Sequence, residues 1–272
     1  MPAIVLRPLT TGELLDRTFS LYREHFSMFV GIAAIPYLGV LALNLAAFVH
    51  VGGTYPLPRL LYSLLALVAS MLAMTAVQAA TLIAVSDVYL GQVANVRGSY
   101  QRVMKRIPAI MGISIAVWVG VGLGFVLLIV PGIIWWMMWS LTIPVAVLEN
   151  KGLGAATKRS RELTKGSRGR ISVIYFLFGV LSYIVTMMLQ LPMIVAGITS
   201  AMHHLGAPMW VLIWGQFGTF ISHILTGPLL TIALSLVYYD QRVRREAFDM
   251  QVMMAALDGT PAQSASTETS FR

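Results

Sequence analysis

The sequence of 272 residues contains no cysteine, and only 11% of its residues are charged. The lack of cysteine excludes disulfide bridges, thiolate nucleophiles and cysteine-based metal sites. Soluble domains carry roughly 25% charged residues. The scarcity of charge, together with 57% hydrophobic residues and a mean hydropathy of +0.78, therefore excludes a soluble globule. We expect the chain to reside in a membrane.

Four long runs lack aspartate, glutamate, lysine and arginine altogether. They lie between residues 24 and 59, 59 and 87, 106 and 149, and 170 and 240. A membrane-spanning helix needs about 20 apolar residues, so the first two runs hold one span each and the last two hold two each. The predicted spans are residues 27–49, 60–91, 109–130, 133–148, 171–199 and 209–239. They belong to one membrane domain, residues 1–254, and residues 255–272 are predicted to form a disordered cytoplasmic tail.

A short amphipathic segment precedes each pair of predicted spans. The first one opens with Thr10 and Glu13 at the spacing of a helix-capping box. Apolar or small residues recur at i, i+4, i+7 and i+11 in all three segments: Leu15, Phe19, Tyr22, Phe26; Val96, Tyr100, Val103, Ile107; and Ala156, Ser160, Leu163, Ser167. This indicates an internal repeat. The predicted fold is all-α, a polytopic bundle of six transmembrane helices in three hairpins, each preceded by a cytoplasmic amphipathic helix in the membrane interface.

Glycine, proline and tryptophan mark the middle hairpin. Pro131-Gly132 is predicted to form its tight turn, and Gly120-x-x-x-Gly124 is a motif through which membrane helices approach one another closely. Indole rings favour the membrane interface, which is where we expect Trp135, Trp136 and Trp139.

Lysine and arginine gather on one side of the predicted spans. Three precede the first span, four surround the second amphipathic segment, seven surround the third and four follow the last span, which leaves Arg59 on the opposite side. By the positive-inside rule, both termini and the amphipathic segments are cytoplasmic. A net charge of +8 in this layout favours anionic lipid over nucleic acid as the partner. The predicted lipid contacts are Lys158, Arg159, Arg161, Lys165, Arg168 and Arg170.

Asp87 is a carboxylate at the end of a predicted span. It continues a stripe of small residues at helical spacing, Ala69, Ala73, Ala76, Ala80 and Ala84, so we expect it on a close-packed face. A lone carboxylate there is costly unless it is paired or protonated. We expect its partner among Arg17, Arg23, Arg97 and Arg102. A proton-carrying role is the alternative, because acids within spans often serve transport.

Catalytic and metal-binding patterns are not found in the sequence. The five histidines are scattered, and no pair of carboxylates or base beside a nucleophile is predicted to converge. We therefore expect no cofactor, no metal and no catalytic residue. Gln78, Gln216 and His223 lie within predicted spans, and together with Asp87 they are the candidate site if the protein is a transporter.

Three stretches together resemble one family of bacterial membrane proteins, the glycerophosphoryl diester phosphodiesterase membrane domain. They are RPLTTGELLDRTFSLYREHF, VPGIIWWMMWSLTIPVAVLENKGLGAATKRSRELTKGSR and LVYYDQRVRREAFD. The resemblance implies a stand-alone multi-span bundle of the bacterial inner membrane, without the catalytic barrel that some members carry. One departure is Ala247, where relatives tend to have glycine.

Three functions follow as hypotheses. The first is a non-catalytic accessory or scaffold protein of the inner membrane that binds anionic lipid or an unknown protein partner through its basic face. The second is a transporter of small solutes or lipids built from the repeated hairpins. The third is a membrane component of glycerophosphodiester or phospholipid metabolism.

Overall fold

The computed structural model describes residues 9–50, 56–203 and 208–246, and every regular element in those ranges is helical. The α-helices in chain order are α1 (Thr11–Glu24), α2 (Phe26–His50), α3 (Pro56–Tyr89), α4 (Val96–Val103), α5 (Ile107–Leu127), α6 (Ile129–Trp139), α7 (Thr142–Leu148), α8 (Leu153–Thr164), α9 (Arg168–Met202) and α10 (Met209–Glu246). A single 3-10 turn, Met104–Arg106, joins α4 to α5. The predicted tail, residues 255–272, lies outside the described residues.

Six segments of the described chain are long and apolar enough to cross a membrane. They are Phe26–Ala47, Leu60–Tyr89, Val96–Leu127, Ile129–Leu148, Arg168–Ser200 and Met209–Arg245. Each overlaps one predicted span, which confirms an all-helical protein with six candidate spans. A helix rises about 1.5 Å per residue. Helix α9, with 35 residues, and helix α10, with 38 residues, are therefore each longer than a hydrocarbon core of about 30 Å is thick.

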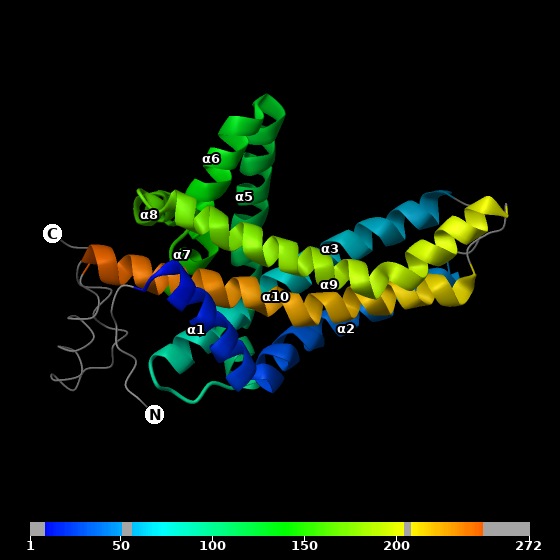
Figure 1. Cartoon of the computed structure of the whole chain (residues 1–272), viewed down its shortest axis with the longest axis horizontal. Helices are drawn as coiled ribbons and strands as arrows, with labels where there is room; N and C mark the ends of the chain where they lie inside the picture. Colours follow the sequence, from blue (N-terminus) through cyan, green and yellow to red (C-terminus); the bar gives the residue numbers. More distant parts are fainter. Residues whose placement is uncertain (1–8, 51–55, 204–207, 247–272) are drawn as a thin grey trace.

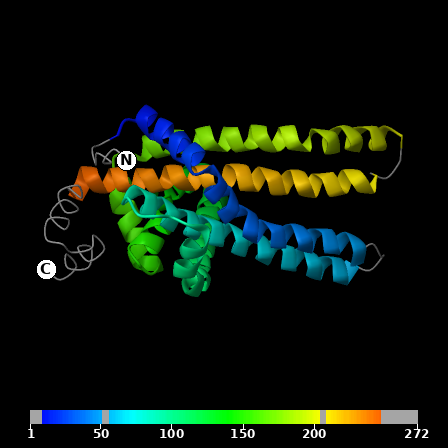
Figure 2. The same ribbon diagram turned by 90° about the horizontal axis from the view of Figure 1, so that it is seen from below.

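The six helices do not run parallel, which differs from the predicted bundle. Helices α2, α3, α9 and α10 lie side by side in a long rod, as Figure 1 and Figure 2 show from two directions, and α10 contacts the other three. Helices α5 and α6 pack on each other and project from the side of this rod (Figure 1). The different direction of α5 and α6 follows from α7, which packs against α3, α8 and α10. Because the helix is interrupted between α6 and α7, the axis of α6 need not follow the axis of α7.

The turn of the projecting pair lies at Leu128 and not at Pro131-Gly132 as predicted. Leu128 is extended, with φ −163° and ψ 147°, and Pro131 and Gly132 lie in the first turn of α6. The prediction was wrong because proline is also well tolerated in the first turn of a helix, where its missing N–H has no intrahelical partner.

Glycines let α5 and α6 approach closely. A Cβ atom at Gly120 would lie 2.5 Å from the Trp139 ring, and one at Gly124 would lie 3.0 Å from the Cα atom of Gly132. A Cβ at Gly132 would lie 2.5 Å from the Phe125 ring. The prediction that Gly120 and Gly124 form a helix contact is therefore confirmed.

The predicted span 133–148 is broken in two. Helix α6 ends at Trp139 and α7 begins at Thr142. Ser160 of α8 satisfies backbone groups at the break: its hydroxyl donates to the Met138 carbonyl oxygen at 2.8 Å and accepts from the Leu141 N–H at 3.2 Å. A polar side chain from another helix thus replaces lost intrahelical hydrogen bonds.

The short helix α1 begins with the predicted capping box. Glu13 accepts from the Thr10 N–H, with 2.7 Å between nitrogen and oxygen, and Thr10 accepts from the Glu13 N–H at 3.3 Å. The face of α1 buried against the protein consists of Leu14, Thr18 and Leu21. These residues lie one position before the recurring row Leu15, Phe19, Tyr22 and Phe26, in which Phe19 and Phe26 are 47% and 45% exposed. The pattern of apolar residues in the sequence does not show which side of α1 packs against the protein and which side stays exposed.

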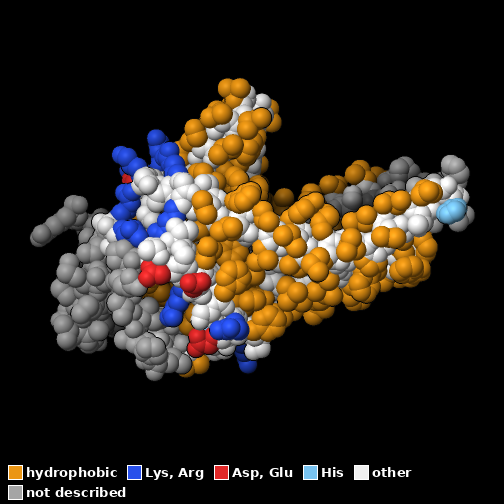
Figure 3. All heavy atoms as spheres, in the orientation of Figure 1, with side chains coloured by type: hydrophobic (Ala, Val, Ile, Leu, Met, Phe, Trp, Pro, Cys, Tyr) orange, Lys and Arg blue, Asp and Glu red, His pale blue; other side chains and the backbone are white. Residues whose placement is uncertain are grey.

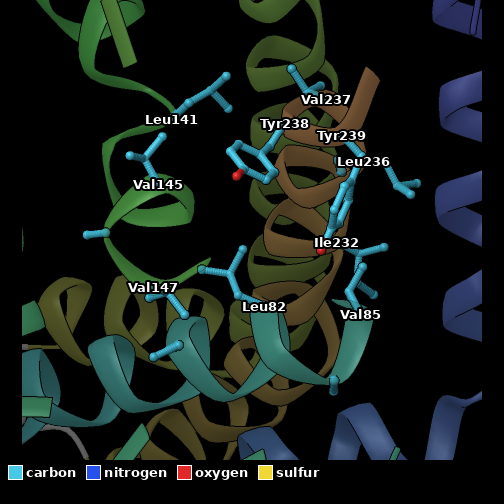
Figure 4. Packing of buried hydrophobic residues seen from close by; sticks show 14 of the residues in the cluster. Leu82, Val85, Leu141, Val145, Val147, Ile232, Leu236, Val237, Tyr238 and Tyr239 are labelled. Atoms are coloured by element: carbon cyan, nitrogen blue, oxygen red, sulfur yellow. The ribbon is translucent and has the colours of Figure 1, made fainter. Parts of the chain in front are cut away.

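Helices α3, α7 and α10 meet in the largest cluster of buried hydrophobic side chains among the described residues, which also includes residues of other helices such as Leu14, Ile110 and Ile171. Figure 4 shows Leu82, Val145 and Tyr238 pointing into the space between α3, α7 and α10. The predicted alanine stripe of α3 faces this region and α2: its buried members are Ala73, Ala76, Ala80 and Ala84. Small side chains there allow the helices to approach closely.

Candidate functional site

Charged side chains gather at one end of the rod. Figure 3 shows lysines, arginines and acids at this end, while the long sides of the rod and the projecting pair are apolar. Three acids here are buried or nearly so: Asp87, Glu149 and Asp240. Each has cationic partners, and these acids organise the site.

Asp87 lies two residues before the end of α3 and is 2% exposed. Both of its carboxylate oxygens accept hydrogen bonds from the guanidinium of Arg102, each at 2.7 Å. Arg102 belongs to α4 and is one of the four arginines predicted from the sequence as partners of Asp87. A carboxylate near a helix C-terminus faces the negative end of the helix dipole, so a bidentate arginine is the partner it needs.

Glu149 caps the C-terminus of α7. Its carboxylate lies 2.7 Å from Lys151 Nζ and 3.4 Å from Arg159 Nε, and it accepts a hydrogen bond from the Tyr238 hydroxyl at 2.9 Å. Burial raises the pKa of the Glu149 carboxyl. The hydrogen bonds from Lys151 and Tyr238 and the positive charge of Arg159 outweigh burial, so the pKa lies below its usual value.

Asp240 binds the end of α10 to the starts of two other helices. Its side chain has 0% exposure and pairs with Arg170 of α9 at 2.6 Å and with Arg244, one turn later, at 2.9 Å. The backbone N–H of Leu9, just before α1, donates to the same carboxylate at 2.7 Å. Arg170 and Arg244 also donate to the carbonyl oxygens of Thr10 and Leu9.

The i, i+4 spacing of Asp240 and Arg244 favours their pairing on a helix, but it does not reveal the wider role of Asp240. A signal was present, because Asp240 follows the buried residues Ala233 and Leu236 on one face of α10, just as Asp87 follows the alanine stripe of α3. The partners Leu9 and Arg170 are 231 and 70 residues away, so no local pattern identifies them.

The six predicted lipid contacts divide into two groups. Lys158, Arg161 and Lys165 are exposed. Arg159 pairs with Glu149, Arg170 pairs with Asp240, and Arg168 is half-buried. Exposed cations can reach a lipid surface without breaking an internal contact, so the first group is the stronger candidate.

The three intramembrane polar residues of the transporter hypothesis are not joined by any hydrogen bond among the described residues. His223 stacks on Tyr37 of α2 with ring centroids 4.9 Å apart, and Gln78 and Gln216 are half-buried. Other polar groups link α9 to α10 instead. Gln190 Nε2 donates to Thr219 Oγ1 at 2.8 Å, and the hydroxyls of Thr186 and Ser222 lie 2.6 Å apart.

Within the described ranges, no group of three or more histidine, aspartate or glutamate residues is arranged to hold a metal ion. Comparison with protein-family models, with curated proteins and with solved structures finds no match. The resemblance to the glycerophosphoryl diester phosphodiesterase membrane domain therefore stays an expectation, and function is argued from the site itself.

Proposed function

We propose that the chain is a non-catalytic, multi-pass protein of the bacterial inner membrane whose basic cytoplasmic face binds the anionic head groups of lipids. The observation that carries this is the layout in Figure 3, with cations at one end of a molecule whose sides are apolar. Each cation close to an anionic leaflet contributes about 1 kcal/mol of binding free energy.

The proposed orientation places the charged end, both termini and the short helices α1, α4 and α8 in the cytoplasm. The pairs α2–α3 and α9–α10 then form membrane hairpins along the rod, with the short helices in the interface. The pair α5–α6 is the third predicted hairpin, and because it projects from the side of the rod, a reporter fusion after Leu128 decides whether it crosses the membrane. Support comes from the positive-inside rule and from the buried faces of the short helices, which carry Leu14, Val103 and Leu163.

A structural role fits the acids better than transport does. Asp87, Glu149 and Asp240 each have arginine or lysine partners at the charged end. The hydrogen bonds between α9 and α10 pair polar groups with one another. Polar side chains paired in this way strengthen helix packing.

The test uses the exposed cations and leaves the ion-paired ones intact. A triple variant, Lys158→Gln, Arg161→Gln and Lys165→Gln, removes three charges from the face. We expect it to retain less phosphatidylglycerol and cardiolipin through purification, as measured by mass spectrometry, with an unchanged thermal midpoint. The control is Lys158→Arg, Lys165→Arg, which keeps every charge. Equal lipid content in the triple variant and the wild type would refute the proposal.

A further inference from the structure

A cavity of about 710 Å³ opens at the charged end of the protein. Three parts of the chain line it. They are residues 9–11 before and at the start of α1, residues 165–167, 169 and 170 around the start of α9, and residues 241, 244 and 245 near the end of α10. Asp240 holds these three parts together through its ion pairs with Arg170 and Arg244 and the hydrogen bond that it accepts from the Leu9 N–H. The cavity is therefore built by long-range contacts and is not a surface irregularity of one loop.

The lining of the cavity is positively charged. Lys165, Arg170, Arg244 and Arg245 contribute to it, and none of the described residues that line it is acidic. Asp240 lies behind the wall with its side chain at 0% exposure. Its single charge is shared by Arg170 and Arg244, which leaves an excess of positive charge facing the opening.

Backbone N–H groups add to this potential. Helix α9 begins at Arg168, and its first N–H groups have no acceptor within the helix. The positive end of the dipole of this 35-residue helix faces the cavity through Gly169. A Cβ atom at Gly169 would meet nothing within 4 Å, so there is space beside the backbone.

An apolar track leads away from the cavity along the same face of α9. Val173, Phe176 and Val180 follow Gly169 at i+4, i+7 and i+11, and all three are exposed. Residues at these spacings share one helix face. An anionic group in the cavity would thus have an apolar surface next to it, which Figure 3 shows as the apolar flank adjoining the charged end.

We infer that this cavity binds a phosphate group, and that the group belongs to a phospholipid whose acyl chain lies along Val173, Phe176 and Val180. Arginine and lysine around a helix N-terminus match the charge and the acceptor oxygens of phosphate. The inference rests on the proposed function and narrows it, because it replaces a diffuse basic face by one saturable site.

The experiment compares two double variants that remove equal charge from the full-length protein in detergent. Lys165→Gln with Arg245→Gln acts on the cavity, and both residues are exposed. Arg97→Gln with Lys105→Gln is the control, because both residues are exposed, neither lines the cavity and neither is among the six predicted lipid contacts. Native mass spectrometry measures binding of the first phosphatidylglycerol molecule, with phosphatidylcholine as a second probe.

We expect the cavity variant to weaken phosphatidylglycerol binding about tenfold or more, because charge-assisted hydrogen bonds are lost, and the control variant to retain wild-type affinity. An equal loss in both variants would overturn the inference while leaving the diffuse basic face of the proposed function in place. A loss in neither would refute both. Inorganic phosphate identifies the source: failure to compete indicates the lipid, and competition that the cavity variant abolishes indicates a soluble phosphate.

Discussion

Removal of the Asp87 carboxylate tests whether its pair with Arg102 is structural. The two side chains share two hydrogen bonds of 2.7 Å across 15 residues of sequence, and they connect α3 to α4. The informative substitutions are Asp87→Asn, which keeps one oxygen acceptor, Asp87→Leu, which keeps none, and Arg102→Gln, which leaves the carboxylate buried without its cation.

The solvent exposure of Asp87 and Arg102 determines how much unfolding free energy each substitution should remove. Removing one partner of a fully buried ion pair costs about 3–5 kcal/mol. The Arg102 side chain is 45% exposed and that of Asp87 is 3% exposed, so water can replace the carboxylate at Arg102 more easily than it can replace the guanidinium at Asp87. We expect losses of unfolding free energy of about 1 kcal/mol for Asp87→Asn, about 2 kcal/mol for Asp87→Leu and about 3 kcal/mol for Arg102→Gln.

Thermal unfolding in detergent measures these losses. A loss of 1 kcal/mol corresponds to a fall of about 2–4 °C in the midpoint for a chain of this size. The double variant Asp87→Leu, Arg102→Gln should lose less than the sum of the single variants, because the pair acts as a unit. Unchanged midpoints in all single variants would refute the structural reasoning. A pH-dependent flux into proteoliposomes that Asp87→Asn abolishes at full stability would establish proton transport instead.

Three further predictions concern other elements of the fold. The pKa of Glu149 lies below its usual value. The carboxylate therefore contributes fully to stability above the usual pKa, and this contribution is lost as the pH falls through the lowered pKa of the folded protein. Below a pH of about 4.5, the thermal midpoint of Glu149→Gln should thus depend less on pH than the midpoint of the wild type. Gly132→Leu should force α5 and α6 apart, because a Cβ atom at Gly132 lies 2.5 Å from the Phe125 ring. Its thermal midpoint should therefore be lower than that of the control Gly122→Leu, because a Cβ atom at Gly122 meets nothing within 4 Å. Reporter fusions after Arg97 and Lys165 should give a cytoplasmic signal. A fusion after Leu128 should give an external signal if α5 and α6 span the membrane, and a cytoplasmic signal there would show that this pair does not cross. An external signal after Lys165 would reverse the proposed topology.

The sequence predicted the helical segments well because membrane burial acts on each segment separately. A run without charges identifies a candidate span whatever the span packs against, and the capping box of Thr10 and Glu13 depends on residues three apart. The sequence limited the possible partners of Asp87 to four arginines, because helix ends on the same side of a membrane lie at the same depth. Choosing Arg102 among them required the path of the chain from residue 90 to 95, which the sequence does not define.

The features that the sequence did not reveal depend on contacts between distant segments. The break after Trp139 is stabilised by Ser160 of α8, and Tyr238 of α10 reaches Glu149 across 89 residues. The direction of α5 and α6 follows from how α7 is anchored, although their composition resembles that of the other spans. The cavity is also of this kind, since its three walls come from both ends of the chain and its middle.

The three buried acids support an internal repeat more directly than the apolar spacing does. Asp87 and Glu149 stand at the ends of α3 and α7, and each pairs with an arginine of the next short helix, 15 and 10 residues later. Asp240 lies within α10, about two turns before its last described residue, and its partners include the backbone of Leu9, ahead of the first short helix. The third pair of long helices is therefore joined by a buried acid to the segment just before α1, so that buried acids connect all three units at the charged end.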